Sequence, residues 1–264
     1  MQLNDFSRRK FLKTASFLAF LPGDSSLSGG LLPPIFSGSE VSDQERINAL
    51  LKQKDPVKWV FAGDSITMGV KHTHGHQAFP NIFEERIRWE LQRMRDIVIN
   101  TGVSGNTTQN VLEDFEWRIT QFKPSVVSLM LGTNDCGGYK IEDFEKNMNL
   151  LLIKIKQINA IPILHTPSLV IPERSPGRKR LPEFASVVRE VAEKNNVILV
   201  DNWSHWENTL RDQPEVNVYK NWLNDPAHPN QTGHQEIARL MFRKLSIFDP
   251  LASTCGGNYY KNND

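Results

Sequence analysis

The sequence is poor in the features that mark several large protein classes. Its 264 residues include only two cysteines, far too few for a disulfide-stapled scaffold. The 31 basic and 30 acidic residues leave a net charge of +1, without the basic stripe typical of nucleic-acid binding. No apolar run approaches the roughly 20 residues that span a bilayer. We therefore expect a soluble globular protein with no nucleic-acid partner and no stable membrane span.

The two cysteines, Cys136 and Cys255, leave their pairing open. An exported protein can keep a disulfide, and Cys255 lies in a Gly-rich tail that a bridge would tether. Two unpaired thiols, one buried and one exposed, are the alternative. If a bridge formed, the carboxyl tail would brace the loop that carries Cys136.

The amino terminus resembles a twin-arginine export signal. Ser7-Arg8-Arg9-Lys10-Phe11-Leu12-Lys13 precedes a short apolar segment, Ala15 to Leu21. A basic amphipathic helix with adjacent arginines by chance is the alternative. We assign residues 1–22 to the signal and expect a periplasmic, cell-surface or secreted protein.

Composition divides the rest of the chain into three parts. Residues 23–42 are rich in Ser, Gly, Leu and Pro, which is typical of a flexible linker. We place one folded domain at residues 43–250 and a carboxyl-terminal tail at 251–264. No internal repeat is present.

One stretch near the start of this domain combines a buried strand with a reactive side chain. The apolar run Val57 to Ala62 ends abruptly in Gly63-Asp64-Ser65. A continuous apolar run is typical of a buried parallel strand, and ligands of open α/β sheets bind beyond the carboxyl ends of such strands. Ser65 is therefore either a reactive hydroxyl at the sheet edge or part of a turn that caps the next helix.

Apolar runs and helical patterns then alternate along the chain. Strands are predicted at 97–99, 126–131, 161–164 and 197–200, and helices over 79–95, from 107 to Pro124, 141–159 and 181–195. Such alternation indicates right-handed βαβ units. We predict an α/β fold, a three-layer α/β/α sandwich with a central, mostly parallel five-stranded sheet of the flavodoxin-like kind.

The segment after the fifth strand is predicted to be irregular. It contains Trp203, Trp206, Tyr219 and Trp222 and leads to Asp225-Pro226-Ala227-His228-Pro229-Asn230. The last helix is expected to start near Thr232, where Thr232-Gly233-His234-Gln235 fits a capping box. Asp225 and His228 then lie in a proline-bounded turn just before a helix. A purely capping role for this turn is the alternative.

Polar residues follow three of the strands and precede the last helix. They are Ser65, Gly105, Asn134 and the pair Asp225 and His228. Because parallel strands end at one edge, these sites can converge. A serine needs a histidine to take its proton, the histidine needs a carboxylate to orient it, and a tetrahedral oxyanion needs fixed donors. The set indicates acyl transfer.

The chain resembles the SGNH hydrolases, also called GDSL-type esterases and lipases. The resemblance rests on four blocks in the family's order: Gly63-Asp64-Ser65-Ile66, Gly105 within Val103 to Thr107, Gly132-Thr133-Asn134-Asp135, and Asp225 to Asn230. It implies that Ser65 is the nucleophile, His228 the general base and Asp225 its orienting partner. It further implies an oxyanion hole formed by Ser65, Gly105 and Asn134. No metal or organic cofactor is implied.

The substrate is less defined because the loops determine it. The expected rim is polar or aromatic, formed by residues 72–76, 137–139 and 173–180 and by the three tryptophans Trp203, Trp206 and Trp222. Aromatic faces with polar neighbours suit sugars, so we expect short acyl esters, acetyl groups on carbohydrate foremost. A lysophospholipase or acyl-thioesterase of the same fold is the first alternative, and a non-catalytic carbohydrate-binding protein the second. The histidines at 72, 74 and 76 lack the further ligands of a zinc site, so a loop rim is expected there. Substrate-binding residues and oligomeric state stay open.

Overall fold

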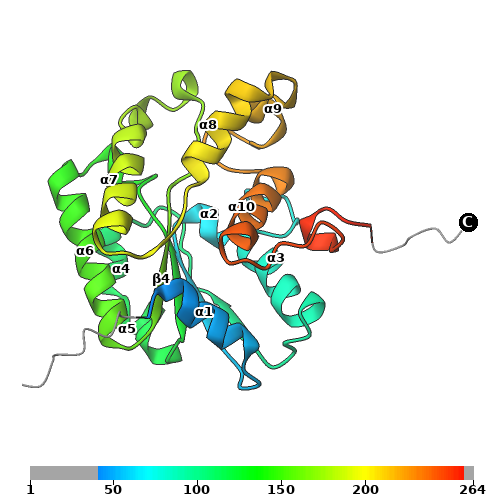
Figure 1. The fold of residues 1–264 in the computed structure, drawn as a ribbon. Coiled ribbons are helices and arrows are strands. Elements are labelled where there is room, and N and C mark those ends of the chain that lie inside the picture. Colours follow the sequence, from blue (N-terminus) through cyan, green and yellow to red (C-terminus); the bar gives the residue numbers. More distant parts are fainter. Residues whose placement is uncertain (1–40, 259–264) are drawn as a thin grey trace, which may run out of the picture. The chain divides into compact units, whose positions relative to one another are not determined.

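The computed structural model describes residues 41–258 (Figure 1). The predicted export signal, all but the last two residues of the predicted linker, and the end of the tail from residue 259 lie outside the described residues.

Five parallel strands form the predicted central sheet. They are β1 (Lys58–Gly63), β2 (Ile97–Asn100), β3 (Val126–Met130), β4 (Ile161–His165) and β5 (Ile198–Val200). Their order is β2-β1-β3-β4-β5, and every neighbouring pair is parallel. In the register, Gly63 lies beside Met130, which lies beside His165. The strand ends therefore share one edge, and the predicted α/β fold class is confirmed.

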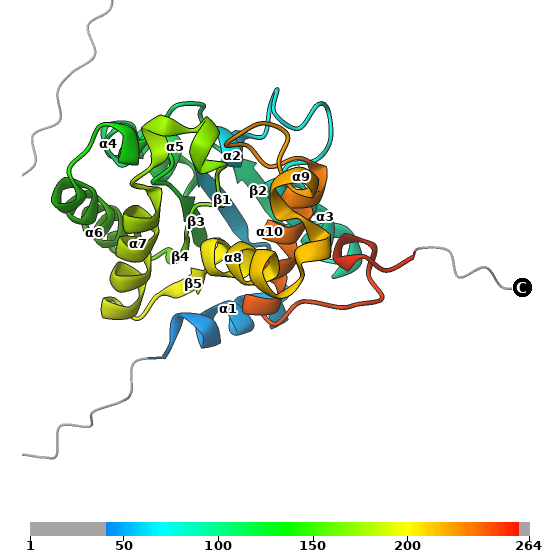
Figure 2. The ribbon, with the colours of Figure 1, turned by 90° about the horizontal axis from the view of Figure 1, so that it is seen from above.

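Helices cover both faces of the sheet (Figures 1 and 2). The longer ones are α1 (Asp43–Lys52), α3 (Phe79–Glu85), α4 (Thr108–Glu113), α6 (Ile141–Gln157), α7 (Leu181–Lys194), α8 (Asn202–Asp212) and α10 (Gln231–Lys244). Three short helices are α2 (Ser65–Met68), α5 (Phe115–Arg118) and α9 (Val218–Asn221). Helices α4, α6 and α7 lie on one face, and α1, α3 and α10 on the other. Each buries its apolar stripe against the strands, as in α6, where Phe144, Met148 and Leu151 are buried.

The segment predicted to be irregular after β5 contains a regular helix, α8, so that prediction was wrong. Asp201 caps the helix by accepting a hydrogen bond from the backbone N–H of Ser204. Trp203 and Trp206 are spaced by three residues and both point inward, which is helical periodicity. The signal was present in the sequence, but the aromatic residues were interpreted as a binding rim.

The predicted cap of the last helix was also wrong. Helix α10 begins at Gln231, and Asn230 is its N-cap, accepting a hydrogen bond from the backbone N–H of Gly233 at 3.1 Å. Asparagine is among the strongest N-cap residues, and it stands two positions before Thr232. The helix predicted over 79–95 is shorter than expected, since it closes with one π-helical turn, Arg86–Glu90.

The chain after Pro250 packs against the domain as far as it is described. Thr254 bonds through its backbone N–H and its hydroxyl to the carboxylate of Glu90. Cys136 and Cys255 are both buried and both free. Their sulfurs have separate partners, the carbonyl of Thr133 and the backbone N–H of Asp249. The bridge that the sequence left open is therefore absent.

None of the helices within residues 41–258 combines the length and the apolar character needed to cross a membrane.

Gly63 ends β1 where the backbone has no room for a side chain. A Cβ at this position would lie 2.2 Å from Thr67 Oγ1 and 2.6 Å from the carbonyl oxygen of Met130. We expect Gly63→Ala to lower the free energy of unfolding by about 1–3 kcal/mol, the usual cost of overpacking. Urea unfolding followed by circular dichroism measures the change. Gly138→Ala is the matched control, because a Cβ there meets nothing within 4 Å. Equal urea midpoints for the two variants would contradict the expectation.

Candidate active site

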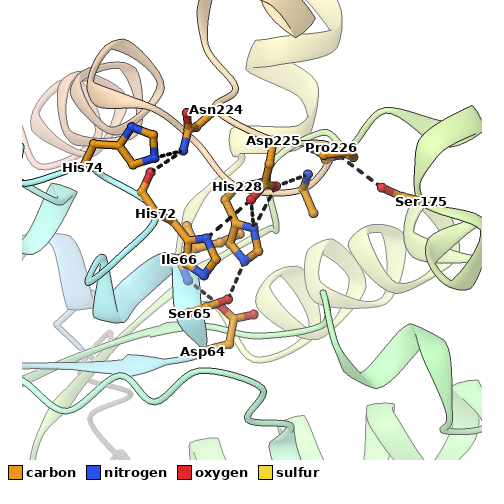
Figure 3. Close-up of polar contacts among 11 residues, drawn as sticks. Asp64, Ser65, Ile66, His72, His74, Ser175, Asn224, Asp225, Pro226 and His228 are labelled. Carbon is orange, nitrogen blue, oxygen red and sulfur yellow. Dashed lines mark hydrogen bonds and ion pairs between the residues drawn. The ribbon is translucent and has the colours of Figure 1, made fainter.

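A hydrogen-bonded chain joins three of the predicted site residues at the carboxyl edge of the sheet (Figure 3). Ser65 Oγ lies 2.9 Å from His228 Nε2. His228 Nδ1 lies 2.8 Å from Asp225 Oδ2 and 2.9 Å from Oδ1. An ionised carboxylate only accepts hydrogen bonds, so Nδ1 carries a proton and Nε2 is free to accept one from the serine. This is the arrangement by which a histidine activates a hydroxyl.

The turn that carries Asp225 and His228 is closed at its base and tied at its tip. The base is an antiparallel bridge between Leu223 and Pro229. Inside the turn, Asp225 Oδ1 accepts backbone N–H bonds from Ala227 and His228, each 2.9 Å long. These bonds fix the carboxylate before it meets the imidazole.

A second loop holds the tip of the same turn. The carbonyl of Pro226 accepts hydrogen bonds from the backbone N–H of Ile171 at 2.8 Å and from Ser175 Oγ at 3.2 Å (Figure 3). Ile171 and Ser175 belong to the long connection between β4 and α7. The turn is therefore held by the β4–α7 connection as well as by its own sequence.

The three tryptophans predicted to line a sugar platform are buried instead. Trp203 is 9% exposed, Trp206 0% and Trp222 6%. Trp206 and Trp222 pack edge to face, with ring centroids 5.2 Å apart. Trp222 lies just before the turn, and its carbonyl accepts from the backbone N–H of Asn230. Trp222 and the Trp206 ring packed against it therefore adjoin the turn, and the predicted sugar platform was wrong.

Ser65 is presented by a short helix whose start Asp64 caps. Asp64 Oδ1 accepts the backbone N–H of Ile66 at 2.9 Å, and Asp64 is fully buried. Ser65 is the first residue of α2, where backbone N–H groups have no partner within the helix. Burial raises the pKa of Asp64 to about 7, with a further rise from the nearby Asp135.

The loops after β2 and β3 meet beside the serine, as the topology predicts. Asn134 Nδ2 donates to the carbonyl of Asn106 at 3.0 Å, next to Gly105. Gly105 has a φ of +82°, a left-handed conformation that favours glycine. A Cβ added at Gly105 would meet no neighbouring heavy atom within 4 Å. Asn134 therefore keeps one amide hydrogen that this bond does not use.

Asp135 braces these two loops, a role that the sequence analysis missed. Its carboxylate is fully buried and accepts bonds from Thr108 N at 2.8 Å, Thr108 Oγ1 at 2.7 Å and Gly132 N at 3.2 Å. Burial raises the pKa of Asp135, while these donors oppose the rise. An acidic residue directly after Asn134 was a visible signal, but its partner Thr108 is 27 residues away.

The electrostatics of the pair suit a neutral base at pH 7. Burial lowers the pKa of His228 below its ordinary value, Asp225 opposes this, and the charges of His72 and Arg178 add to it. Burial alone would raise the pKa of Asp225, yet the N–H of Ala227 and the His228 ring lower it overall. The imidazole can therefore take a proton, and the carboxylate stays ionised beside it.

His72 is the residue here that sequence reasoning missed most clearly. Its ring stacks on that of His228, with centroids 3.5 Å apart and planes 6° from parallel. The ligand atoms of His72, Asp225 and His228 lie within 4.8 Å of one another. Stacked rings do not point their in-plane lone pairs at a common centre, which metal ligation by both would need. The geometry favours a contact within the protein over a shared ion.

Residues 61–236 match the family model of the GDSL-like lipase/acylhydrolases, well over half of the chain. The chain belongs to this family. It is a carboxylic ester hydrolase. The resemblance to SGNH hydrolases is thereby confirmed.

Two relatives align with this esterase over most of their own length. It is 26% identical over 210 residues to acetylxylan esterase of Geobacillus stearothermophilus, covering 72% of this chain and 94% of the relative. It is 25% identical over 185 residues to thioesterase 1/protease 1/lysophospholipase L1 of Escherichia coli (strain K12), covering 69% and 80%. A crystal structure of the Geobacillus esterase shares the fold, with a TM-score of 0.59, 23% identity and coverage of 72% and 94%.

The raised pKa of Asp64 predicts how the esterase's stability depends on pH. The folded state binds this proton near pH 7, whereas an unfolded aspartate binds it near 3.8. The folded state holds more protons in between, so the free energy of unfolding falls as pH rises from about 4 to about 7. Asp64→Asn keeps an oxygen that caps α2 and removes the titration. We expect urea unfolding at several pH values to show a smaller fall for this variant.

Asp212→Asn is the control for that experiment. Asp212 is exposed, and Arg211 lowers its pKa, so its contribution to the pH dependence has the opposite sign. Equal pH slopes for wild type and Asp64→Asn would show that Asp64 does not titrate as argued.

Proposed function

We propose that this esterase hydrolyses short acyl esters, acetyl groups on carbohydrate foremost, through an acyl-enzyme on Ser65. The observation that carries the chemistry is the chain from Ser65 Oγ to His228 Nε2 at 2.9 Å and on to Asp225 at 2.8 Å. An unactivated serine hydroxyl is a weak nucleophile, and this contact gives its proton a place to go.

The reaction runs in two halves. Ser65 Oγ attacks the ester carbonyl carbon while His228 Nε2 takes the hydroxyl proton. The tetrahedral intermediate collapses, and the leaving alcohol takes that proton from His228 as the acyl–serine bond remains. Water then gives a proton to His228 and attacks the acyl carbon. The second tetrahedral intermediate collapses, His228 returns that proton to Ser65 Oγ, and the carboxylic acid is released. Asp225 holds the imidazole in one tautomer and stabilises its charge in both halves.

Three donors are assigned to the oxyanion. They are the backbone N–H groups of Ser65 and Gly105 and the side-chain amide of Asn134. The Asn134 amide has a second hydrogen besides the one given to Asn106, and Gly105 sits in an open left-handed turn. Preorganised donors of this kind stabilise the charge that develops only in the transition state.

Support for an acetylated carbohydrate comes from one relative and from the rim. Acetylxylan esterase aligns over 94% of its own length. Of the expected rim residues, His74, His76, Lys179 and Arg180 are exposed and polar, which suits hydroxyl-rich substrates. The buried tryptophans give no support. The twin-arginine-like segment stays a prediction, and export would bring the enzyme to polysaccharides outside the cell.

An acyl-thioesterase or lysophospholipase is the second candidate, and a cavity favours it. The cavity measures about 310 Å³ and is lined mainly by apolar side chains, among them Leu169, Val170, Leu210 and Tyr219. Arg178 also lines it and is close enough to His228 to lower that residue's pKa. A longer acyl chain would gain from burial there. The Escherichia coli relative carries both of these activities in its name.

Removing the proposed nucleophile or base separates catalysis from mere binding. We expect Ser65→Ala and His228→Ala each to lower kcat for p-nitrophenyl acetate about 10⁴-fold or more, since such residues act as a unit. A fluorophosphonate probe should label Ser65 in the wild type only. Ser186→Ala on α7 is the control and should keep full activity. A loss of less than tenfold would overturn these role assignments, whereas a wild type with neither Ser65 labelling nor ester turnover would favour a non-catalytic carbohydrate-binding protein.

Acyl chain length decides between the two candidate substrates. We expect kcat/KM for p-nitrophenyl acetate to exceed that for the octanoate at least tenfold, and acetylated xylo-oligosaccharides to be deacetylated. Palmitoyl-CoA and lysophosphatidylcholine should react slowly, with Ser65→Ala as the blank for each substrate. A preference for octanoyl or longer chains would overturn the acetylesterase proposal in favour of the second candidate.

A further inference from the structure

Two histidines share the carboxylate of Asp225. Asp225 Oδ2 lies 2.8 Å from His228 Nδ1 and 3.4 Å from His72 Nδ1. The His72 ring covers the flat face of the His228 ring at a centroid separation of 3.5 Å (Figure 3). His72 therefore touches both the proposed base and its orienting partner.

His72 is held in this position by the turn itself. Asn224 Nδ2 donates to the carbonyl oxygen of His72 at 3.0 Å, and the backbone N–H of Asn224 donates to the carbonyl of His228 at 2.9 Å. Asn224 Nδ2 also lies 3.0 Å from His74 Nε2. The His72 side chain is only 17% exposed. These contacts fix one loop residue against a turn more than 150 residues away in sequence.

We propose that His72 is a positioning residue for the Asp225–His228 pair, which it holds in the plane that presents Nε2 to Ser65. This inference rests on the proposed roles of Ser65 and His228. The stacked ring restricts rotation of the imidazole about its χ2 angle and keeps water from its face. The Nδ1 contact restrains Oδ2 of Asp225, whose side chain is 37% exposed.

The same contact places His72 where a charge on its ring lowers the pKa of His228. The groups around His228 that carry or can carry charge are Asp225, His72, Arg178 and the buried His234. A cationic His72 would repel the imidazolium that must form on His228 in each half-reaction. The acid side of the activity profile should therefore respond to replacement of His72.

Replacement of the ring tests the positioning role. We expect His72→Ala to lower kcat for p-nitrophenyl acetate about 10- to 100-fold, since a displacement of about 1 Å can cost 10²-fold. KM should stay within about twofold. His72→Phe, which can still stack, should recover part of kcat. Gln77→Ala, at an exposed position of the same loop outside the expected rim, is the matched control and should behave as wild type.

The pH dependence of kcat/KM distinguishes a positioning role from a merely structural one, because a merely structural role would leave it unchanged. In His72→Gln the acid limb of kcat/KM should shift to higher pH, because no neighbouring charge then opposes protonation of His228. Gln77→Ala should leave the limb in place. Where His72→Ala does not fold, as judged by circular dichroism, His72→Phe and His72→Gln carry the test.

Three outcomes would be decisive. Reduced kcat with a shifted acid limb supports the inference. If kcat and pH profile match those of Gln77→Ala in all folded His72 variants, the inference is overturned while the proposed function stands. If the wild type shows neither ester turnover nor Ser65 labelling, the proposed function fails first.

Discussion

The contact between Ser65 Oγ and His228 Nε2 is the constraint on which the site depends. It joins residues 163 positions apart and must be held to a few tenths of an ångström for a proton to move along it. The parallel sheet fixes one partner, because β1 ends in Gly63 at the same edge as β3 and β4. The other partner sits in a turn outside the sheet, which needs its own restraints.

Those restraints come from every side of the turn. A bridge from Leu223 to Pro229 closes it below, the β4–α7 connection grips Pro226, and buried tryptophans pack under it. His72 covers the remaining face of the imidazole. The rigidity of the pair is thus distributed over three segments, and the tryptophans expected at a substrate rim are buried instead.

Buried carboxyl groups shape the other half of the site. Asp64 caps the helix that presents Ser65, and Asp135 ties together the loops that carry Gly105 and Asn134. Burial raises the pKa of both groups. Burial of these two carboxyl groups costs free energy of folding, and in return they fix the backbone donors at the sheet edge. Such an exchange of stability for function is common.

The sequence by itself determined the class of sheet, its five strands, the family and the positions of Ser65, Gly105, Asn134, Asp225 and His228. Those features depend on residues that are close together in the sequence. Strand periodicity, turn residues and short motif blocks indicate the same local structure wherever they occur. Only the tertiary structure decided that Trp206 and Trp222 are core, that Asp135 pairs with Thr108 and that His72 stacks on His228. These depend on side chains far apart in the chain, and no spacing in the sequence encodes which distant segment will pack against which.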